Sequence, residues 1–310
     1  MITKQSTANH EDWKALRHKY IGGSDAAAVV GMNAYVSPYA LWAEKSGRLP
    51  GFDGNLATEV GTYLEDFVAQ KFAEVTGKKV RKSNLSWFND EYPWAIANID
   101  REIVGEDAGL EIKTTSELNT QKFKGGEYPA NYYCQCMHYM AVTGKARWYL
   151  AVLIGNREFK WFTIERDEDE IKALMEAEKS FKQLVDSDTP PMADGASSTS
   201  ETLSTLYPNS RDMAIGIGSF ERDLENYFRL KDQLKNIELT MTGVENRIKA
   251  HLGECAMGEG EKYKVSWKTQ SRSTFDSKKF IADHPEMDVS KYYKSSVSRP
   301  FKVTEKKGNV

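Results

Sequence analysis

Residues 95–114 read AIANIDREIVGEDAGLEIKT, and this stretch decides the fold. Apolar and polar side chains alternate on both sides of Gly105-Glu106, which predicts two strands joined by a tight hairpin turn. A glycine in the first turn position suits a type II′ turn. With a two-residue turn, Asp100 lies directly opposite Glu111 on the neighbouring strand.

The second strand of this hairpin places a lysine beside the two carboxylates. Side chains alternate along a strand, so Glu111 and Lys113 share one face while Ile112 points into the opposite layer. Two carboxylates with Cβ atoms ~5 Å apart repel each other unless a cation lies between them. Magnesium, or manganese as a substitute, suits two carboxylates with waters and a substrate phosphate, and Lys113 could orient the attacking water. The alternative is a solvated hairpin in which Lys113 merely screens the two acids.

The hairpin resembles the catalytic motif of the PD-(D/E)XK nuclease superfamily. The likeness is strongest to phage recombination exonucleases of the YqaJ type, which are similar to lambda exonuclease. By this resemblance Asp100 and Glu111 hold the metal, the backbone carbonyl of Ile112 also reaches it, and Lys113 is catalytic. The resemblance implies an α/β fold: a nuclease core with a mixed central sheet flanked by helices, followed by a helical and β C-terminal extension.

Two flanking helices extend the resemblance. Glu65, in Gly61-Thr-Tyr-Leu-Glu65, matches the helical glutamate that completes the metal site in this family. Gln135 and Tyr139 match the Gln-x-x-x-Tyr motif on the helix after the hairpin, and we expect Gln135 to act in catalysis and Tyr139 to contact DNA. Taken one at a time, Glu65 could be a plain surface charge, and the other two could be core or rim contacts.

A candidate phosphate site lies further upstream. Gly22-Gly23-Ser24 enters a predicted helix, so the free N–H groups of its first turn and the Ser24 hydroxyl point to one place, where the helix dipole favours an anion. Arg17 could clamp the same phosphate with its planar guanidinium. In the family resembled, an arginine and a serine at this spacing bind the 5′-phosphate at the end of the digested strand. The alternatives are a plain N-cap for Ser24 and a surface ion pair for Arg17.

The chain divides into three predicted parts. Residues 1–187 form the nuclease domain. Residues 188–212, rich in Pro, Ser, Thr, Asp and Gly near their start, are predicted as a linker or surface loop. Residues 213–310 form a helical and β C-terminal module, for assembly or for contact with DNA or a partner.

The C-terminal module has two sequence signals of its own. Apolar residues from Leu230 to Ile248 recur at heptad spacing, which predicts a helix that packs against another helix. Residues 263–267 and 299–303 are strand-like runs. Aromatic residues here alternate with Lys and Arg, which indicates either a small core or a surface that stacks bases and contacts phosphates.

Composition excludes several classes of protein. The 310 residues carry a net charge of −3, 40% are hydrophobic and 28% are charged, which is typical of a folded protein and argues against one that coats nucleic acid by bulk charge. Residues 261–310 nevertheless carry twelve Lys or Arg against six acids, a weak indication of an anionic partner. No run approaches ~20 apolar residues and no signal peptide is evident, so we expect a cytoplasmic protein without membrane contact. The three cysteines cannot form a four-cysteine iron–sulfur site.

The resemblance implies a specific activity. We expect a magnesium-dependent exodeoxyribonuclease that digests one strand of double-stranded DNA from an end, 5′ to 3′, and leaves a 3′ single strand for phage-type recombination. It also implies a homo-oligomeric ring around DNA and a phage single-strand annealing protein as partner. Two alternatives stay open: an endonuclease or repair nuclease with the same metal site, and a non-catalytic DNA-binding or assembly protein with the same fold.

Overall fold

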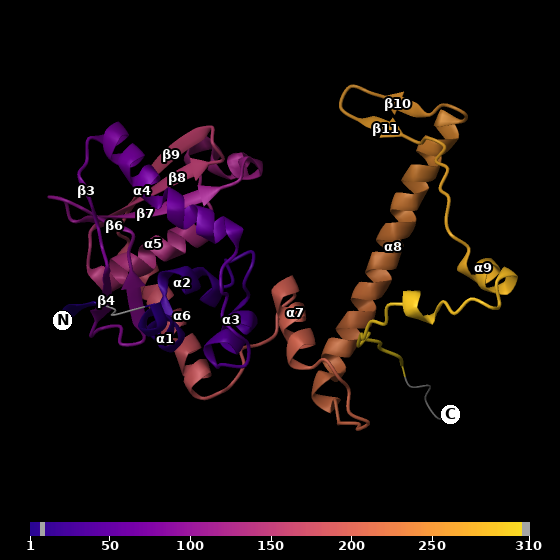
Figure 1. Cartoon of the computed structure of the whole chain (residues 1–310), viewed down its shortest axis with the longest axis horizontal. Coiled ribbons are helices and arrows are strands. Elements are labelled where there is room, and N and C mark those ends of the chain that lie inside the picture. Colours follow the sequence, from indigo (N-terminus) through magenta and orange to yellow (C-terminus); the bar gives the residue numbers. More distant parts are fainter. Residues whose placement is uncertain (7–9, 306–310) are drawn as a thin grey trace. The chain divides into compact units, whose positions relative to one another are not determined.

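The structure, a computed structural model, describes residues 1–6 and 10–305, the side chains of residues 10–14 excepted. It separates into two compact units, residues 1–208 and residues 209–310 (Figure 1). The candidate catalytic residues all belong to the first unit. Among the described residues, no helix is both long and apolar enough to cross a bilayer.

The described residues of the first unit form two sheets, ordered β3-β6-β7-β8-β9 and β1-β4-β5-β2. In the larger sheet β7 and β8 are parallel while the other neighbours are antiparallel, so the sheet is mixed as predicted. The strands are β1 Ile2–Ser6, β2 Ile21–Gly22, β3 Val80–Lys82, β4 Leu85–Asn89, β5 Ala95–Asn98, β6 Arg101–Ile103, β7 Ala108–Thr115, β8 Arg147–Ile154 and β9 Glu158–Glu165.

Helices cover both faces of the larger sheet (Figure 1). On one face Phe72 of α4 packs with Ile112 of β7, and on the other Met140 of α5 packs with Trp148 of β8. Burial on both faces explains why β8 is apolar along nearly its whole length. The helices of this unit are α1 His10–Lys19, α2 Gly23–Val29, α3 Pro38–Lys45, α4 Leu56–Thr76, η1 Glu117–Gly126, α5 Ala130–Thr143, α6 Glu168–Asp186 and α7 Ser197–Leu206.

The hairpin has the register that the sequence predicts. Arg101 pairs with Leu110 and Glu102 with Gly109, which continues to Asp100 opposite Glu111. The paired region ends earlier than expected, because β6 stops at Ile103 and β7 starts at Ala108. The connection is therefore the four residues 104–107 rather than a two-residue turn.

Asp100 lies where the chain passes from one sheet to the other. β5 ends at Asn98 in the smaller sheet, and β6 begins at Arg101 in the larger one. The Asp100 carboxylate accepts a hydrogen bond from the backbone N–H of Ile112 at 2.7 Å. This bond lies just beyond the last backbone pair of the hairpin, Arg101 with Leu110, and it holds the carboxylate beside β7.

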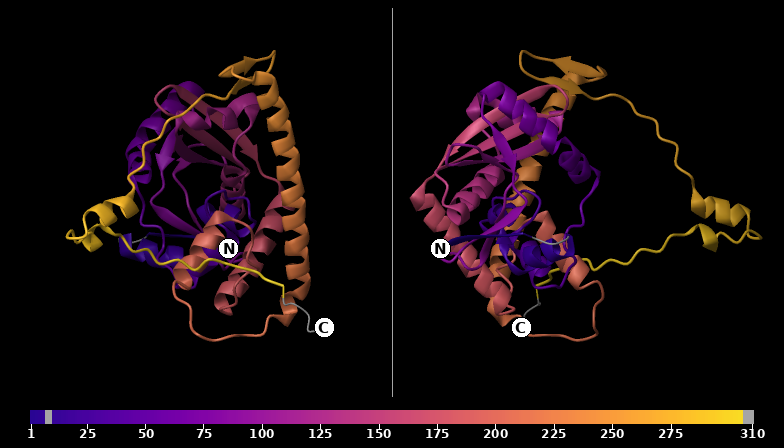
Figure 2. Two further views of the ribbon diagram at one scale, coloured as in Figure 1. Left: turned by 90° about the vertical axis from the view of Figure 1, so that its right-hand side faces the viewer. Right: turned by 60° about the vertical axis from the view of Figure 1, so that its left-hand side comes forward.

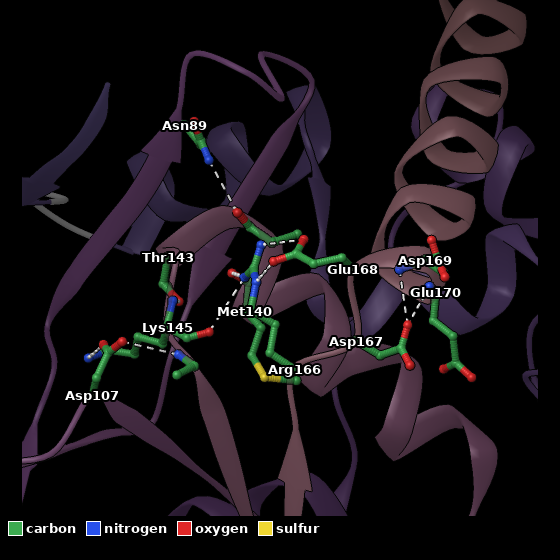
Figure 3. A network of polar contacts seen from close by, with 12 residues as sticks. Asn89, Asp107, Met140, Thr143, Lys145, Arg166, Asp167, Glu168, Asp169 and Glu170 are labelled. Carbon is green, nitrogen blue, oxygen red and sulfur yellow. Dashed lines mark hydrogen bonds and ion pairs between the residues drawn. The ribbon is translucent and has the colours of Figure 1, made fainter.

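A polar network holds the far end of α5 (Figure 3). The Arg166 guanidinium donates to the carbonyl of Met140 at 2.5 Å and to Glu168 Oε2 at 3.1 Å. The Asp167 carboxylate accepts two N–H groups from the first turn of α6, each at 3.0 Å, and so caps that helix. These contacts fix α5 and α6 relative to the larger sheet.

Part of the stretch 188–212, predicted as a linker or loop, is helical. Helix α7 packs on α3, and the hydroxyl of Thr199 donates to Ser37 Oγ at 2.7 Å. Thr199 and Thr202 are buried. The first unit thus continues to residue 208, and the sequence hid this because the buried groups of α7 are threonines rather than a periodic apolar stripe.

The second unit is built on one long helix, α8 Glu221–Leu252 (Figure 2). The predicted heptad residues of α8, from Leu230 to Ile248, are 38–58% exposed. Residues 299–303 form no strand in the described structure; instead Phe301 contacts the ring of Tyr227, with centroids 6.4 Å apart. The remaining elements are η2 Gly218–Phe220, β10 Met257–Glu259, β11 Lys264–Ser266, α9 Ser277–Asp283 and η3 Ser290–Tyr292.

Candidate active site

One cavity brings all the predicted site residues together. Its volume is ≈ 530 Å³, and its walls come from α1, α2, α4, α5, β2, β5 and β7. Residues separated by more than a hundred positions in the sequence therefore meet at one place. The predicted residues that line it are Arg17, Gly23, Ser24, Glu65, Asp100, Glu111, Ile112, Lys113, Gln135 and Tyr139.

The buried carboxylate of Glu111, the half-buried carboxylate of Asp100 and the amine of Lys113 line this cavity together. Glu111 is 2% exposed, and its Oε1 lies 2.6 Å from Lys113 Nζ. Burial raises the pKa of Asp100 well above its usual range, and the charge of Glu111 raises it further. Burial also raises the pKa of Glu111, against the opposing effect of Lys113. Burial acts to lower the pKa of Lys113, but the two carboxylates outweigh it and the net pKa is raised.

The two carboxylates fit a divalent cation. Glu111 Oε2 is buried and has no hydrogen-bond partner among the described residues, although its neighbour Asp100 is a second carboxylate. Lys113 offsets one of the two negative charges, and a hard cation bound by oxygen would offset the other. Within the described residues no three His, Cys, Asp or Glu side chains are grouped closely enough to form a full ligand set. Such a cation would therefore take its remaining ligands from water and substrate.

Glu65 reaches the cavity from α4, but Arg101 holds one of its oxygens. The Arg101 guanidinium pairs with Glu65 Oε1, with Asp66 Oδ1 at 2.5 Å, and with the backbone carbonyl of Asp100 at 2.7 Å. Arg101 is only 3% exposed. Glu65 thus lines the cavity with one of its oxygens bound to Arg101. No motif in the sequence marks Arg101, although it directly follows Asp100 in the chain.

The first turn of α2 differs from the predicted arrangement. Gly22, not Ser24, is the N-cap residue, and its N–H donates to Asp25 Oδ2 at 2.9 Å. Ser24 follows inside the first turn, exposed to the cavity. Gly23 is buried against α5: a Cβ atom there would lie 2.5 Å from the ring of Tyr139. Only glycine permits this close approach of α2 to α5.

A buried lysine joins Arg17 to this turn. Lys45 Nζ lies 2.6 Å from Asp25 Oδ2 and donates to the backbone carbonyl of Arg17 at 2.6 Å. Lys45 is 5% exposed, so these bonds are shielded from solvent. They fix the backbone of Arg17 close to the start of α2. No motif in the sequence marks Lys45, because its partners lie on other elements.

Helix α5 contributes a hydrogen-bonded pair. Gln135 Nε2 donates to the phenol oxygen of Tyr139 at 2.8 Å, and both side chains are buried. Burial raises the pKa of Tyr139 well above its usual range, and the charges of Glu111 and Asp100 raise it further. Tyr139 is therefore a neutral phenol at ordinary pH, and Gln135 keeps its amide oxygen for another partner.

Asn98 is a further cavity residue that the sequence analysis missed. Its Oδ1 accepts a hydrogen bond from Ser86 Oγ at 2.7 Å, so its amide nitrogen points elsewhere. Asn98 stands two positions before Asp100, where the alternation of side chains along a strand could have revealed it.

Comparisons with known proteins identify the family of this chain. Residues 12–146 match the family described as the YqaJ-like viral recombinase domain. The chain is 34% identical over 311 residues to the uncharacterized protein YqaJ of Bacillus subtilis strain 168, and the match spans 98% of this chain and 97% of that protein.

A solved structure shares the fold. The chain matches LHK-Exo, an alkaline exonuclease of Laribacter hongkongensis solved in complex with dAMP, at a TM-score of 0.50 and 22% identity. The match covers 57% of this chain and 93% of LHK-Exo. This likeness concerns the fold, and it confirms the predicted class of nuclease core.

Proposed function

Because this chain belongs to the YqaJ-like viral recombinase family and has an exonuclease fold, we propose that it is a metal-dependent exodeoxyribonuclease that digests one strand of double-stranded DNA from an end. One observation carries the proposal: a single cavity joins the Asp100, Glu111 and Lys113 cluster to Arg17 and Ser24. The first group suits phosphodiester hydrolysis, and the second suits recognition of a terminal phosphate. A nuclease that cuts within a strand would not need the second group.

The proposed metal is magnesium, for which manganese can substitute. Asp100, Glu111 and the Ile112 carbonyl would hold it directly, and Glu65, which lines the same cavity, would complete the site through a bound water. When bound, the metal activates water and stabilises the charge that develops on the phosphate. The unpaired Glu111 Oε2 supports this assignment.

Lys113 and Gln135 have separate roles in the proposed reaction. Lys113, held by Glu111 at 2.6 Å, orients the attacking water and offsets negative charge in the transition state. Gln135, fixed by its bond to Tyr139, offers its amide oxygen to the water or the substrate. Water attacks phosphorus and the bond to O3′ breaks, which leaves a 3′-hydroxyl on the released nucleotide and the phosphate on the shortened strand.

The proposed direction is 5′ to 3′. Arg17, Ser24 and the buried turn at Gly23 bind the 5′-phosphate, and Tyr139 packs beneath that turn. Each cut creates a new 5′-phosphate for the same residues, so the enzyme can advance along one strand. The LHK-Exo complex with dAMP, a mononucleotide, is consistent with release of single nucleotides. We also propose a homo-oligomeric ring around DNA and a phage single-strand annealing protein as partner for the 3′ strand.

Digestion of a linear duplex labelled at one 5′ end tests this function. Wild-type protein and Lys113→Ala are compared with magnesium and with EDTA, on linear DNA and on a closed circle. We expect loss of one strand of the linear duplex only, with magnesium only, and none with the variant. Equal cutting of linear and circular DNA would establish an endonuclease, and binding without cutting would establish a non-catalytic DNA-binding protein.

A further inference from the structure

A second cavity borders the candidate active site. Its volume is ≈ 230 Å³, and it lies among the segment after α2, the end of β7, η1 and the start of α5. The residues that matter here are Met32, Tyr35, Thr115, Asn119, Lys122 and Tyr132. We call it the distal cavity. No predicted site residue lines it.

Two elements lead from the active site into the distal cavity. Along β7, Thr114 lines the first cavity and Thr115 the second. Along α5, Gln135 lines the first and Tyr132, one turn earlier, the second. Lys113 Nζ lies at the border, 5.4 Å from the centre of the Tyr132 ring. A DNA strand that passes Lys113 in this direction would enter the distal cavity.

The lining of the distal cavity suits a nucleobase. Tyr35 is 75% exposed, yet its backbone is fixed, because Asn33 Oδ1 accepts the N–H groups of Tyr35 at 2.8 Å and Val36 at 3.1 Å. An exposed aromatic ring on a fixed loop is a stacking platform for bases. The cavity is smaller than the ~300–1,000 Å³ typical of sites for drug-sized ligands, so it fits one base rather than several nucleotides.

Polar groups complete this lining. Asn119 Nδ2 donates to Thr115 Oγ1 at 2.8 Å, which fixes the amide and directs its oxygen away from that hydroxyl. Lys122 is exposed beside it and could meet a phosphate of the same nucleotide. An aromatic ring, an oriented amide and a cation are the groups that recognise a single nucleotide of a DNA strand.

We propose that the distal cavity binds the base of the second nucleotide from the 5′ end, on the 3′ side of the scissile phosphate. This inference rests on the proposed exonuclease function. Arg17 and Ser24 line only the first cavity, so the terminal nucleotide lies between them and the carboxylates, and the next nucleotide lies beyond Lys113. That second nucleotide carries the new 5′-phosphate after the cut. A stacked base would keep the shortened strand bound between cuts.

An abasic substrate tests the proposal. The rate of the first cut is measured on a 5′-phosphorylated duplex with a normal base, with an abasic residue at position 2, and with one at position 4. For wild-type protein we expect the abasic residue at position 2 to slow the cut by about tenfold, as for loss of one stacking contact, and the one at position 4 to have little effect. Tyr35→Ala should make the first cut in the normal duplex about tenfold more slowly than wild type, and the abasic residue should not slow this variant further. Tyr35→Phe, which keeps the ring, should behave as wild type.

Tyr63→Ala is the matched control. Tyr63 is 79% exposed on α4 and lines neither cavity, so this variant should keep the wild-type rates and the full abasic effect. The proposal is overturned if the position 2 effect is absent in wild type or persists undiminished in Tyr35→Ala. Binding of the same duplexes in EDTA tests the base site separately from the exonuclease function. A position 2 effect on binding that requires Tyr35, with no cleavage when magnesium is added, supports the base site and refutes the exonuclease function.

Discussion

Replacing Lys113 by methionine should destabilise the metal-free protein at neutral and alkaline pH. Lys113 Nζ lies 2.6 Å from Glu111 Oε1, and the exposed fractions of the two side chains are 24% and 2%. Removing one partner of a buried ion pair costs ~3–5 kcal/mol, and the partial exposure of Lys113 favours the lower end, about 3 kcal/mol. A domain of this size loses ~2–4 °C in Tm per kcal/mol, so the expected fall is about 6–12 °C.

The loss should depend on pH in a defined direction. Burial raises the pKa values of Asp100 and Glu111 above those of the unfolded chain. The folded protein therefore binds more protons, and its stability falls as pH rises above the ordinary carboxyl range near ~4. Lys113 opposes this fall because it favours the ionised carboxylates. The deficit of Lys113→Met should be smallest near the ordinary carboxyl range of ~4 and should grow as pH rises.

Thermal unfolding followed by circular dichroism in EDTA measures this effect. Magnesium should restore most of the Tm of Lys113→Met, because a cation between the carboxylates replaces the lost charge, while cleavage stays abolished. Lys71→Met is the control, since Lys71 pairs with Glu74 at 3.1 Å on the surface, and such pairs contribute ~0–1 kcal/mol. A Tm in EDTA at about pH 8 equal to that of wild type, or a deficit independent of pH, would refute the reasoning.

Three further outcomes are expected. Arg17→Ala should slow digestion of a 5′-phosphorylated duplex by about tenfold or more and leave a 5′-hydroxyl duplex unaffected, because the charge-assisted contact to the terminal phosphate is lost; equal slowing of both substrates would argue against a phosphate role. Arg101→Met should raise the magnesium concentration needed for half-maximal cleavage by ~10–100-fold, since Glu65 loses the group that orients it; an unchanged magnesium curve would contradict this. Gly109→Ala should lower the free energy of unfolding by ~1–3 kcal/mol in urea, because a Cβ atom there would lie 2.3 Å from the Trp148 ring, and an unaltered midpoint would show that the ring can move.

The hairpin of β6 and β7 shows how much structure the local sequence determines. Its register follows from strand alternation and the position of the turn, and Arg101 pairs with Leu110 as those two features require. The predicted order of Asp100, Glu111 and Lys113 on one face therefore needed no knowledge of the rest of the chain. The length of the connection was less well determined, because pairing next to a turn depends on contacts outside the hairpin.

Local signals also misled where burial was polar. Helix α7 was predicted as a linker or loop because its buried residues, Thr199 and Thr202, give no apolar stripe. The heptad residues of α8, Leu230 to Ile248, predict a packed helix, but they stay exposed in this chain. Hydrophobic periodicity identifies the apolar face of a helix, but it does not show whether another element packs against that face.

The sequence by itself therefore determined which residues carry the proposed chemistry, since Asp100, Glu111 and Lys113 lie on one short hairpin whose geometry is local. The tertiary structure alone decided how that chemistry is held and where a strand would run. Arg101 turns Glu65 of α4 toward the hairpin, Lys45 ties Arg17 to the start of α2, and the distal cavity exists only where the end of β7 meets the start of α5. Each of these contacts joins residues far apart in the chain, and their partners are fixed by the packing of whole elements, which no local pattern of residues encodes.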